Sequence, residues 1–513
     1  MGMFIIIIAA VLGVLAACAV KPLPKLEQVE SRALPANDNT QLAKLLATEL
    51  LEDPNLTGIF VLGDPLDAFV ARSAIMKLAE ESIDLQYYIW RPDTSGMMLL
   101  RDVYEAAERG VRVRLLLDDN NTRGMDDLLS ILNDHPNIEI RLFNPFTNRK
   151  VRFLGYIIDF KRLNHRMHNK SLIVDGQVAI TGGRNIGDEY FAAGDGMVFS
   201  DLDVMAIGKI VPELARDFDN YWNSVLAYPS EQIITKEYGN DYLAALDKLR
   251  RTKFRADVST YELALLNSRL LEKMVNNDIR WRWSEAHLVS DPPSKALGVW
   301  SENDFQKPLL EAIGNVKKEI FFVSPYFVPT GEGTKFLIDL VKQGIDVSVL
   351  TNSYKATDVI FVHAGYMEYR QELIDAGVKI YELKAEVSDD GISGVTDKGL
   401  VGSSASSLHA KTFVVDRSQL FVGSLNLDPR SAKINTEMGV VILNSTLSKE
   451  IGEEIDAQLL TQSYKVISED GKLHWQVYEN GELVDTFDAE PNTNIFTRGF
   501  MKFLTILPIE GLL

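Results

Sequence analysis

The sequence has almost no cysteine, since Cys18 is the only one among 513 residues. A single thiol excludes an intramolecular disulfide and any metal site built from cysteines. Positive charge is also scarce: 53 Lys and Arg face 72 Asp and Glu, which gives a formal net charge of −19. Such a field repels free nucleic acid, so no nucleic-acid partner is expected. The remaining balance, 46% hydrophobic and 24% charged, is that of a globular chain with roughly two to four domains.

The lone cysteine lies at the end of an apolar run, FIIIIAAVLGVLAACAV, at residues 4–20. Its segment LAAC resembles the lipobox of bacterial lipoproteins, in which the leader is cut before a cysteine that then carries lipid. The preceding MGMF lacks the basic residues of a normal signal peptide. The alternative is an uncleaved membrane anchor, although an apolar run of 17 residues is short for one. In that case Lys21, Lys25 and Arg32 would favour keeping the following domain in the cytoplasm. Both interpretations predict a membrane-attached protein of the bacterial envelope, and we favour lipidation of Cys18 over an uncleaved inner-membrane anchor.

One pattern of strands and helices runs twice through the chain. VLGDP (61–65) is answered by LVSDP (288–292), and ESIDLQYYIW (81–90) by KEIFFVSPYFV (318–328). Each copy continues with an amphipathic helix, a glycine and apolar strands, at residues 99–119 and 138–145 in the first copy and 336–353 and 378–384 in the second. Helix alternating with strand over this distance predicts an α/β sheet covered by helices.

The repeat also predicts how the chain is divided. We expect a leader or anchor at 1–18, a polar tether at 19–55, a first half at 56–229, a helical connector at 230–285, a second half at 286–465, and a hairpin with an amphipathic tail at 466–513. Within the connector, residues 261–277 are a helix candidate. The tail either lies in a membrane interface or packs on the second half. The two halves suggest a duplication with an internal pseudo-twofold axis. The alternative, two independent domains of shared ancestry, does not explain why both keep the polar residues described next.

Each half carries the same polar frame, His-x-Lys-x-x-x-x-Asp. The two frames, 241 residues apart, are His168, Lys170 and Asp175, and His409, Lys411 and Asp416. In a strand, residues i and i+2 face the same way, so each His and Lys should project side by side. The aspartates fall near an apparent hairpin turn, where we expect them to orient or brace the chain.

A second set of residues repeats with the same offset. Gly183 is answered by Ser424, and Asn185 by Asn426. Glycine lets a backbone come close to a ligand, while Ser and Asn can donate hydrogen bonds to phosphate oxygens. We therefore expect these four residues to bind a substrate phosphate.

Joined across the axis, the frames would place two imidazoles, two ammonium groups and two amides in one cleft. This set suits a phosphodiester, because the cations and amides stabilise charge developing at phosphorus. One neutral His can attack phosphorus, and the other, protonated, can donate to the departing alcohol. Imidazole titrates near ~6.5, so both forms are available and no metal or cofactor is needed. His363 is a weaker pocket candidate, and the remaining histidines, at positions 135, 165, 287 and 474, are expected to be structural.

The duplicated frame resembles the signature of the phospholipase D superfamily, as seen in HNKSLIVDGQVAITGGRNIGDEYF and HAKTFVVDRSQLFVGSLNLDPRSAKINTEMGVVI. The finer similarity is to the cardiolipin synthase C-like branch. It rests on DFDNYWNS (217–224), VHAGYMEYRQELIDAGVKIYELK (362–384) and the ending LPIEGLL (507–513). The resemblance covers roughly residues 55–513. It implies two α/β/α sandwich halves, related by a pseudo-twofold axis, that share one active-site cleft.

The resemblance also implies an activity: a phosphatidyltransferase that makes cardiolipin from phosphatidylglycerol and a second phospholipid, with phosphatidylethanolamine as one candidate. His168 would be the nucleophile and form a phosphohistidine, while His409 would act as general acid and then as base. The lysines and asparagines of the frames would bind phosphate. Glu437 matches a family Glu, and its first-half counterpart would be Asp201, although Asp203 lies close by. The sequence does not identify an accessory protein.

Three other functions stay open at this point. A phospholipase D-type hydrolase that releases phosphatidic acid would use the same intermediate, so the frames do not separate transfer from hydrolysis. A phosphodiesterase or nuclease fits the frames but not the net charge and the membrane attachment. A non-enzymatic envelope protein that binds anionic lipid would be favoured by degraded frames, and both frames are intact.

Overall fold

The computed structural model describes residues 22–50, 55–193, 198–235, 247, 261–263, 265–276, 278–385 and 406–505. The predicted lipidation site Cys18 and the ending at 507–513 lie outside these residues, as do residues 236–246 and 248–260 of the predicted connector. In the part of the chain that the structure describes, no helix has the length and apolar character needed to cross a membrane.

The first half alternates strands with helices, as the repeat predicts. Its elements are α2 (Gln41–Leu50), β1 (Thr57–Leu62), α3 (Pro65–Leu78), β2 (Ser82–Ile89), α4 (Thr94–Glu108), β3 (Arg112–Asn121), α5 (Asp126–Asn133), β4 (Ile138–Phe143), α6 (Arg152–Ile158), α7 (Phe160–Leu163), β5 (Ser171–Val174), β6 (Val178–Gly182), α8 (Asp188–Phe191), β7 (Val198–Ser200), β8 (Asp203–Gly208), α9 (Val211–Trp222), β9 (Ala227–Pro229) and α10 (Ser230–Ile233).

The second half follows α13 (Arg269–Val275) and repeats this order before adding a C-terminal hairpin and helix. Its elements are β10 (Arg282–Ser290), the 3₁₀ helix η2 (Pro293–Leu297), α14 (Gln306–Ile313), β11 (Glu319–Val323), α15 (Thr330–Lys342), β12 (Asp346–Asn352), α16 (Ile360–Asp375), β13 (Lys379–Leu383), β14 (Ser406–Leu408), β15 (Thr412–Val415), β16 (Gln419–Gly423), α17 (Pro429–Lys433), β17 (Met438–Leu443), α18 (Ser445–Gln462), β18 (Ser463–Glu469), β19 (Lys472–Glu479), β20 (Glu482–Phe487) and α19 (Ile495–Thr505).

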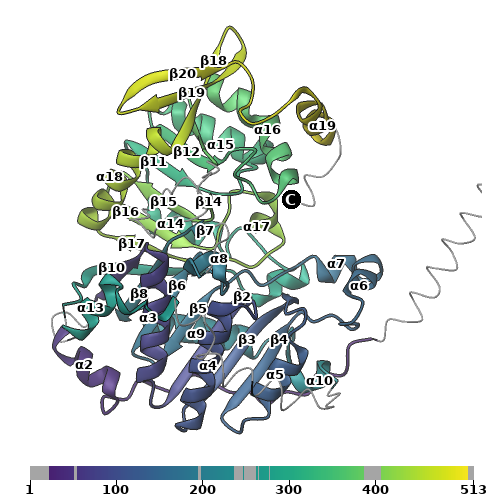
Figure 1. Ribbon diagram of the computed structural model, residues 1–513, viewed down its shortest axis with the longest axis vertical. Coiled ribbons are helices and arrows are strands. Elements are labelled where there is room, and N and C mark those ends of the chain that lie inside the picture. The colour runs from purple at the N-terminus through teal and green to yellow at the C-terminus, as the bar shows by residue number, and fades with distance from the viewer. Residues whose placement is uncertain are drawn as a thin grey trace, which may run out of the picture.

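The strands show that the two halves are copies of one fold. In the first half the order is β9-β4-β3-β2-β5-β6-β8-β1, and β2, β3 and β4 run parallel. In the second half it is β18-β13-β12-β11-β15-β16-β17-β10, and β11, β12 and β13 run parallel. Antiparallel pairing of β1 with β10 joins the halves into one sheet. Figure 1 shows the second half stacked on the first. The predicted duplicated α/β fold is therefore confirmed.

The core is continuous between the halves. Helices α3 and α4 pack together on one face of the first-half sheet, while α9 contacts its strands from the other face. Phe218 of α9 belongs to an apolar cluster that also contains Ile442 of β17 and Ile451 of α18. Helices α15 and α16 pack against each other and add Leu337 and Tyr366 to the core of the second half. Because one apolar cluster contains residues of both halves, the halves hold each other in a fixed relation.

Two segments differ from what the sequence predicts. Residues 22–50, expected to be part of a tether, lie against the first half: Arg114 Nη1 donates to the carbonyl of Ser31 at 3.0 Å, and α2 adds helical turns. The helix expected over 261–277 is broken at Asn267 and Ser268. The Ser268 hydroxyl accepts from the Leu271 amide at 3.1 Å, so a capped new helix, α13, starts there.

Candidate active site

The frame aspartates hold two matching hairpins in place. Asp175 directly follows β5, and its carboxylate accepts backbone N–H groups from residues 80, 81 and 82 at 2.8–3.0 Å, at the start of β2. Asp416 directly follows β15 and accepts those of residues 317, 318 and 319 at 2.7–3.0 Å, at the start of β11. Both aspartates have a positive φ, 52° and 50°, as the turn requires. Each carboxylate is fully engaged in bracing the turn.

The histidines and lysines of the frames precede the strands, whereas the sequence predicted them inside the strands. β5 begins at Ser171 and β15 at Thr412, one residue after each lysine. The reason is that these segments bond to the other half of the molecule. The His168 amide donates to the carbonyl of Thr436 at 2.9 Å, and the His409 amide to the carbonyl of Ser200 at 2.8 Å.

This exchange between the halves is extended by a small parallel sheet. Strand β7 of the first half pairs with β14 of the second, which runs directly into His409. Met167, next to His168, forms the corresponding bridge to Thr436. His168 therefore lies beside Thr436, the residue before Glu437, and His409 lies beside Ser200, the residue before Asp201.

The two histidines form crossed pairs with those carboxylates. His168 Nδ1 lies 2.8 Å from Glu437 Oε2 and 3.1 Å from the carbonyl of Ser424. His409 Nδ1 lies 2.5 Å from Asp201 Oδ2. Because carboxylate and carbonyl oxygens only accept hydrogen bonds, each Nδ1 must carry the hydrogen. The reactive lone pair of each neutral imidazole is then on Nε2.

Burial keeps both imidazoles neutral in this state. The side chains of His168 and His409 are buried, and desolvation lowers the pKa of His168 to about 4, against the raising effect of Glu437. Desolvation and Lys411 likewise lower the pKa of His409, although Asp201 opposes them. Lys411 also lowers the pKa of His168, and Lys170 that of His409, so the two frames act on each other. Both histidines belong to one site.

The two lysines are buried, and neither forms an ion pair with any of the residues that the structure describes. Lys170 and Lys411 are each 1% exposed. Each Nζ donates to the backbone carbonyl of the histidine two residues earlier, in short contacts. Desolvation lowers the pKa of Lys170 to about 7 and that of Lys411 to about 8, and Lys411 also lowers the pKa of Lys170. Two such ammonium groups in one site favour a ligand with negative charge.

Gly183 and Ser424 contact the carboxylates of their own halves. A Cβ at Gly183 would lie 2.0 Å from Asp201 Oδ1, so only glycine fits. The Ser424 hydroxyl donates to Glu437 Oε2 at 2.5 Å and thereby supports the carboxylate that orients His168. Gly183 and Ser424 thus contact Asp201 and Glu437, and their contact with a substrate phosphate stays a prediction.

The two asparagines differ in their surroundings. Asn185 Nδ2 donates to the Tyr190 hydroxyl at 3.0 Å, and its Oδ1 accepts from the Ile89 amide at 3.1 Å. Asn426 is 5% exposed, and its Oδ1 has no hydrogen-bond partner among the described residues. Asn426 therefore has more hydrogen-bonding capacity left for a ligand than Asn185.

Asp203 and His363 form their contacts outside the site. Asp203, the alternative to Asp201, binds Arg72 at 2.7 Å and Arg184 at 3.4 Å inside the first half. His363 forms a buried pair with Glu490, which Arg370 also contacts at 3.2 Å. That cluster ties α16 to the C-terminal segment and belongs to the packing of the second half.

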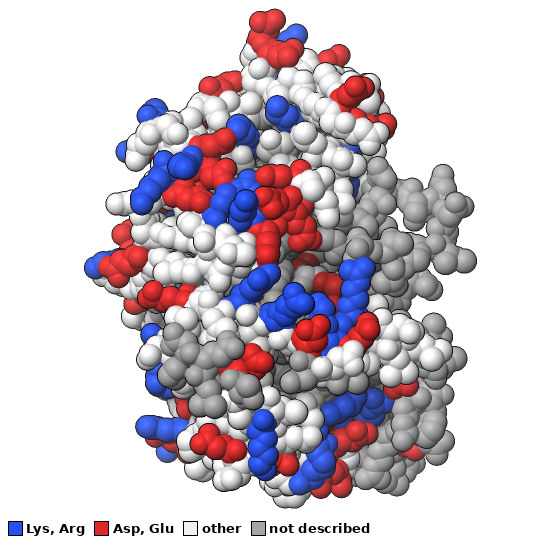
Figure 2. All heavy atoms as spheres, turned by 90° about the vertical axis from the view of Figure 1, so that its left-hand side faces the viewer, with Lys and Arg blue, Asp and Glu red and all other residues white. Residues whose placement is uncertain are grey.

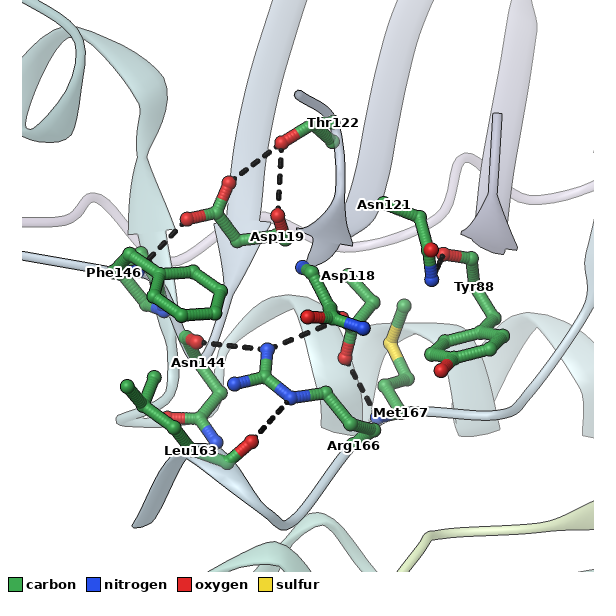
Figure 3. A network of polar contacts seen from close by, with 12 residues as sticks. Tyr88, Asp118, Asp119, Asn121, Thr122, Asn144, Phe146, Leu163, Arg166 and Met167 are labelled. Atoms are coloured by element: carbon green, nitrogen blue, oxygen red, sulfur yellow. Dashed lines mark hydrogen bonds and ion pairs between the residues drawn. The ribbon is translucent and has the colours of Figure 1, made fainter. Parts of the chain in front are cut away.

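A polar network fixes the chain on its way to His168 (Figure 3). At the end of β3, Asp118 accepts from the Met167 amide at 2.9 Å and from Arg166 Nη1 at 3.2 Å. Arg166 also donates to the carbonyls of Leu163 and Asn144, at 2.7 and 3.2 Å. These bonds hold the backbone next to the imidazole, and they explain why Asp118 and Arg166 are buried together.

Sequence reasoning missed several residues of the site. Ser431, in α17, donates to Glu437 Oε1 at 2.8 Å. Aromatic rings pack edge-on against the imidazoles, with ring centroids 5.0 Å apart for Tyr88 and His168 and 5.1 Å apart for Tyr190 and His409. Their numbers do not differ by the 241-residue offset, so the repeat could not reveal them. Tyr88, Tyr190 and Ser431 all lie within the repeated or family-like segments, and that nearness was the signal available in the sequence.

Several known proteins are similar to this chain in sequence. A family model described as cardiolipin synthase, PLD-like domain, matches residues 73–222 and again 309–459. Cardiolipin synthase C of Escherichia coli is 41% identical over 478 residues, which cover 92% of this chain and 100% of the relative. An uncharacterized protein of Helicobacter pylori is 31% identical over 488 residues, or 91% of this chain and 92% of the relative.

A solved structure agrees on the fold. The crystal structure of phosphatidylserine synthase from Haemophilus influenzae matches with a TM-score of 0.53 at 14% identity, covering 82% of this chain and 92% of the other. Both matches of the family model contain a complete His-Lys-Asp frame, and the relative from Escherichia coli aligns along nearly the whole chain. With two such copies folded around one site, this chain belongs to the cardiolipin synthase family of phospholipase D-like proteins.

Proposed function

We propose that this protein is a phosphatidyltransferase that makes cardiolipin from phosphatidylglycerol and a second phospholipid through a phosphohistidine. The crossed pairs, His168 with Glu437 and His409 with Asp201, carry the proposal, because they supply two oriented imidazoles in one site. The 41% identity to cardiolipin synthase C of Escherichia coli supports the substrate class.

In the first step His168 acts as nucleophile. Its Nε2 lone pair attacks the phosphorus of the donor lipid, and the P–O bond to the departing headgroup breaks. His409, protonated when the anionic phosphate is bound, gives its Nε2 proton to the leaving oxygen. Glu437 accepts the Nδ1–H of His168 and stabilises the positive charge that develops on the ring.

In the second step His409 acts as base. Its neutral Nε2 removes the proton from a hydroxyl of phosphatidylglycerol, and the resulting oxygen attacks phosphorus while the P–N bond to His168 breaks. Lys170 and Lys411, together with the Asn185 and Asn426 amides, are proposed to hold the phosphate oxygens. The bound anion then stabilises the charged form of both lysines, which offsets the cost of their burial.

The proposed substrates are lipids, so we also propose that the enzyme is attached to the envelope membrane through a lipid on Cys18. This proposal is supported by the LAAC segment and the absence of any other cysteine. The mass of the mature N-terminus tests it, since an intact Met1 with an unmodified thiol contradicts lipidation.

The activity itself is tested with purified protein in phosphatidylglycerol vesicles, with and without phosphatidylethanolamine, by mass analysis of the products. Cardiolipin should accumulate. Phosphatidic acid as the main product would instead identify a phospholipase D-type hydrolase. Cleavage of DNA with unchanged lipid would contradict the lipid substrate, and bound but unchanged lipid would identify a binding protein.

A further inference from the structure

The segment α6–α7 carries a stripe of exposed apolar side chains. Phe153, Ile157 and Phe160 are 72%, 59% and 44% exposed. Phe153 and Ile157 are four residues apart and so share one side of α6, while Phe160 begins α7 directly after the break at Asp159. Water-exposed aromatic and aliphatic side chains that lie together in this way mark a surface that contacts something apolar.

The other side of α6 is anchored by polar contacts. Arg152 Nη1 donates to the carbonyls of Asp119 and Asn120, at 2.7 and 2.9 Å. The Tyr156 hydroxyl donates to Asn120 Oδ1 at 2.7 Å. A Cβ at Gly155 would lie 3.0 Å from the Leu163 side chain, which shows how closely the two short helices pack. The apolar stripe is therefore presented to the outside by a fixed segment.

Helix α19 presents the same pattern from the second half. Phe496, Phe500 and Phe503 are 85%, 51% and 55% exposed, at i, i+4 and i+7. On its inner side, Met501 and Leu504 are buried against Ala364 of α16. Figure 1 shows α6, α7 and α19 on the same right-hand side of the molecule, one group from each half. We call the six exposed side chains the apolar rim.

The charge around the apolar rim differs from that of the whole chain. α19 contains Arg498 and Lys502 and no acidic residue, although the net charge of the protein is −19. Near α6–α7, Lys150 and Lys161 are exposed, and the acid Asp159 is paired with Arg162 at 2.6 Å. The opposite side of the molecule, which Figure 2 shows, mixes many acidic with basic side chains. Apolar side chains flanked by cations suit an anionic lipid surface.

Both parts of the apolar rim connect to the active site. Directly after α7, Asn164 accepts from Arg430 Nη1 of the second half at 2.9 Å, four residues before His168. In the second half, Met501 and Leu504 of α19 pack against Tyr354, in the loop before α16. The Ala356 carbonyl of that loop accepts a hydrogen bond at 2.7 Å from the hydroxyl of Ser407, which lies two residues before His409. A surface held by both parts would therefore lie next to the segments that carry both histidines.

We propose that the apolar rim is the docking surface of this protein for an anionic phospholipid bilayer, with α6–α7 and α19 seated in the headgroup region on either side of the active site. The inference rests on the proposed lipid substrate, and it adds where the bilayer contacts the protein. It requires no opening of the fold, because the six side chains already face outward.

The test is a depth measurement on the full chain in vesicles. An environment-sensitive label is attached to cysteine in I157C, F500C and, as a control, L266C. Leu266 is 66% exposed and lies just before α13, and Figure 1 shows α13 on the side of the molecule opposite to α6, α7 and α19. Chain without an added cysteine gives the background from Cys18. Spin labels on the acyl chains of phosphatidylglycerol should quench both rim labels at least about threefold more than the label at 266, and more than in phosphatidylcholine. Equal quenching at all three positions, or rim labels shielded from lipid by a protein partner or a second copy, overturns the proposal.

A kinetic comparison separates docking from chemistry. I157E and F500E together should lower turnover of phosphatidylglycerol in vesicles about tenfold or more and leave turnover of a water-soluble short-chain phosphodiester within about twofold. L266E should change neither. Equal loss on both substrates would overturn the docking role. A protein that docks by the quenching measurement but turns over no lipid would contradict the proposed function and leave the docking surface standing.

Discussion

The two carboxylates of the site do the same work in different settings. Glu437, which orients His168, accepts hydroxyl groups from Ser424 at 2.5 Å and Ser431 at 2.8 Å. Asp201, which orients His409, accepts the Leu202 amide at 2.8 Å and lies against Gly183. A long, flexible carboxylate is held by side-chain hydroxyls, whereas a short one is held by close packing of the backbone. Duplication therefore preserved the imidazole–carboxylate pair and changed the means of holding it.

The largest effect should come from the histidines, and it should separate their roles. H168A and H409A are each expected to lower cardiolipin formation by about 10³-fold or more, because neither imidazole covers both functions. A phosphodiester with a p-nitrophenolate leaving group needs no proton from an acid. Release of p-nitrophenol should therefore recover in H409A and stay low in H168A.

The reverse pattern would exchange the two roles and make His409 the nucleophile. The control for folding is the thermal unfolding temperature of each variant, since a loss caused by misfolding would lower activity on both substrates and the unfolding temperature together.

An intermediate effect should come from the residues behind the carboxylates. S424A removes the hydroxyl that holds Glu437 and should lower kcat about tenfold, as expected when an orienting hydrogen bond is lost. G183A places a methyl group 2.0 Å from Asp201 Oδ1, so it should lower kcat by about 10²-fold or more. Steady-state kinetics with phosphatidylglycerol measure both.

The matched control is S418A. Ser418 lies in the turn between β15 and β16, and its hydroxyl contacts only the Val415 carbonyl, at 3.3 Å, among the described residues. Its activity should stay within about twofold. Equal effects of S424A and S418A would contradict the assigned role of Ser424.

The smallest effect concerns pH and the buried lysines. Sulfate, which is a dianion at every pH from 7 to 9, serves as a phosphate mimic. Burial lowers the pKa of Lys170 to about 7, and a bound dianion raises it again, so binding takes up a proton above pH 7. Affinity should therefore fall as pH rises from 7 to 9, by at most about tenfold per unit for each proton taken up. Calorimetry measures it.

K170M should bind sulfate more weakly at pH 7 and lose part of this pH dependence. A wild-type affinity that is independent of pH from 7 to 9 would contradict the buried, proton-accepting lysine.

Much of the fold and site was predictable because the repeat is regular. The offset of 241 residues located both frames, and the strands and turns around them follow from β-branched runs and hairpin signals. Even the aspartates at the turns could be assigned a bracing role from position alone. These predictions rest on the local alternation of apolar and polar residues, and such local preferences are kept in the folded protein when they match the packing of the core.

What the sequence could not supply is the exchange between the halves. Alignment of the copies pairs Asp201 with Glu437, but it does not indicate that each acid binds the histidine of the opposite copy. The aspartates of the two Asp-Pro pairs likewise diverge: Asp64 caps α3, whereas Asp291 binds Lys295 at 2.7 Å and accepts the Glu437 amide at 2.9 Å. Such contacts depend on how the sheets meet, which no short sequence window contains.

The crossed pairs also constrain how a chain of this kind can change over evolutionary time. His168 and Glu437 are 269 residues apart, and His409 and Asp201 are 208 apart, so neither copy owns a complete catalytic unit. A copy inherited alone, or exchanged with that of a distant homologue, brings a histidine whose partner it does not encode. A mutation in one copy therefore affects catalysis by the histidine of the other copy, and the two copies must evolve together as a single gene.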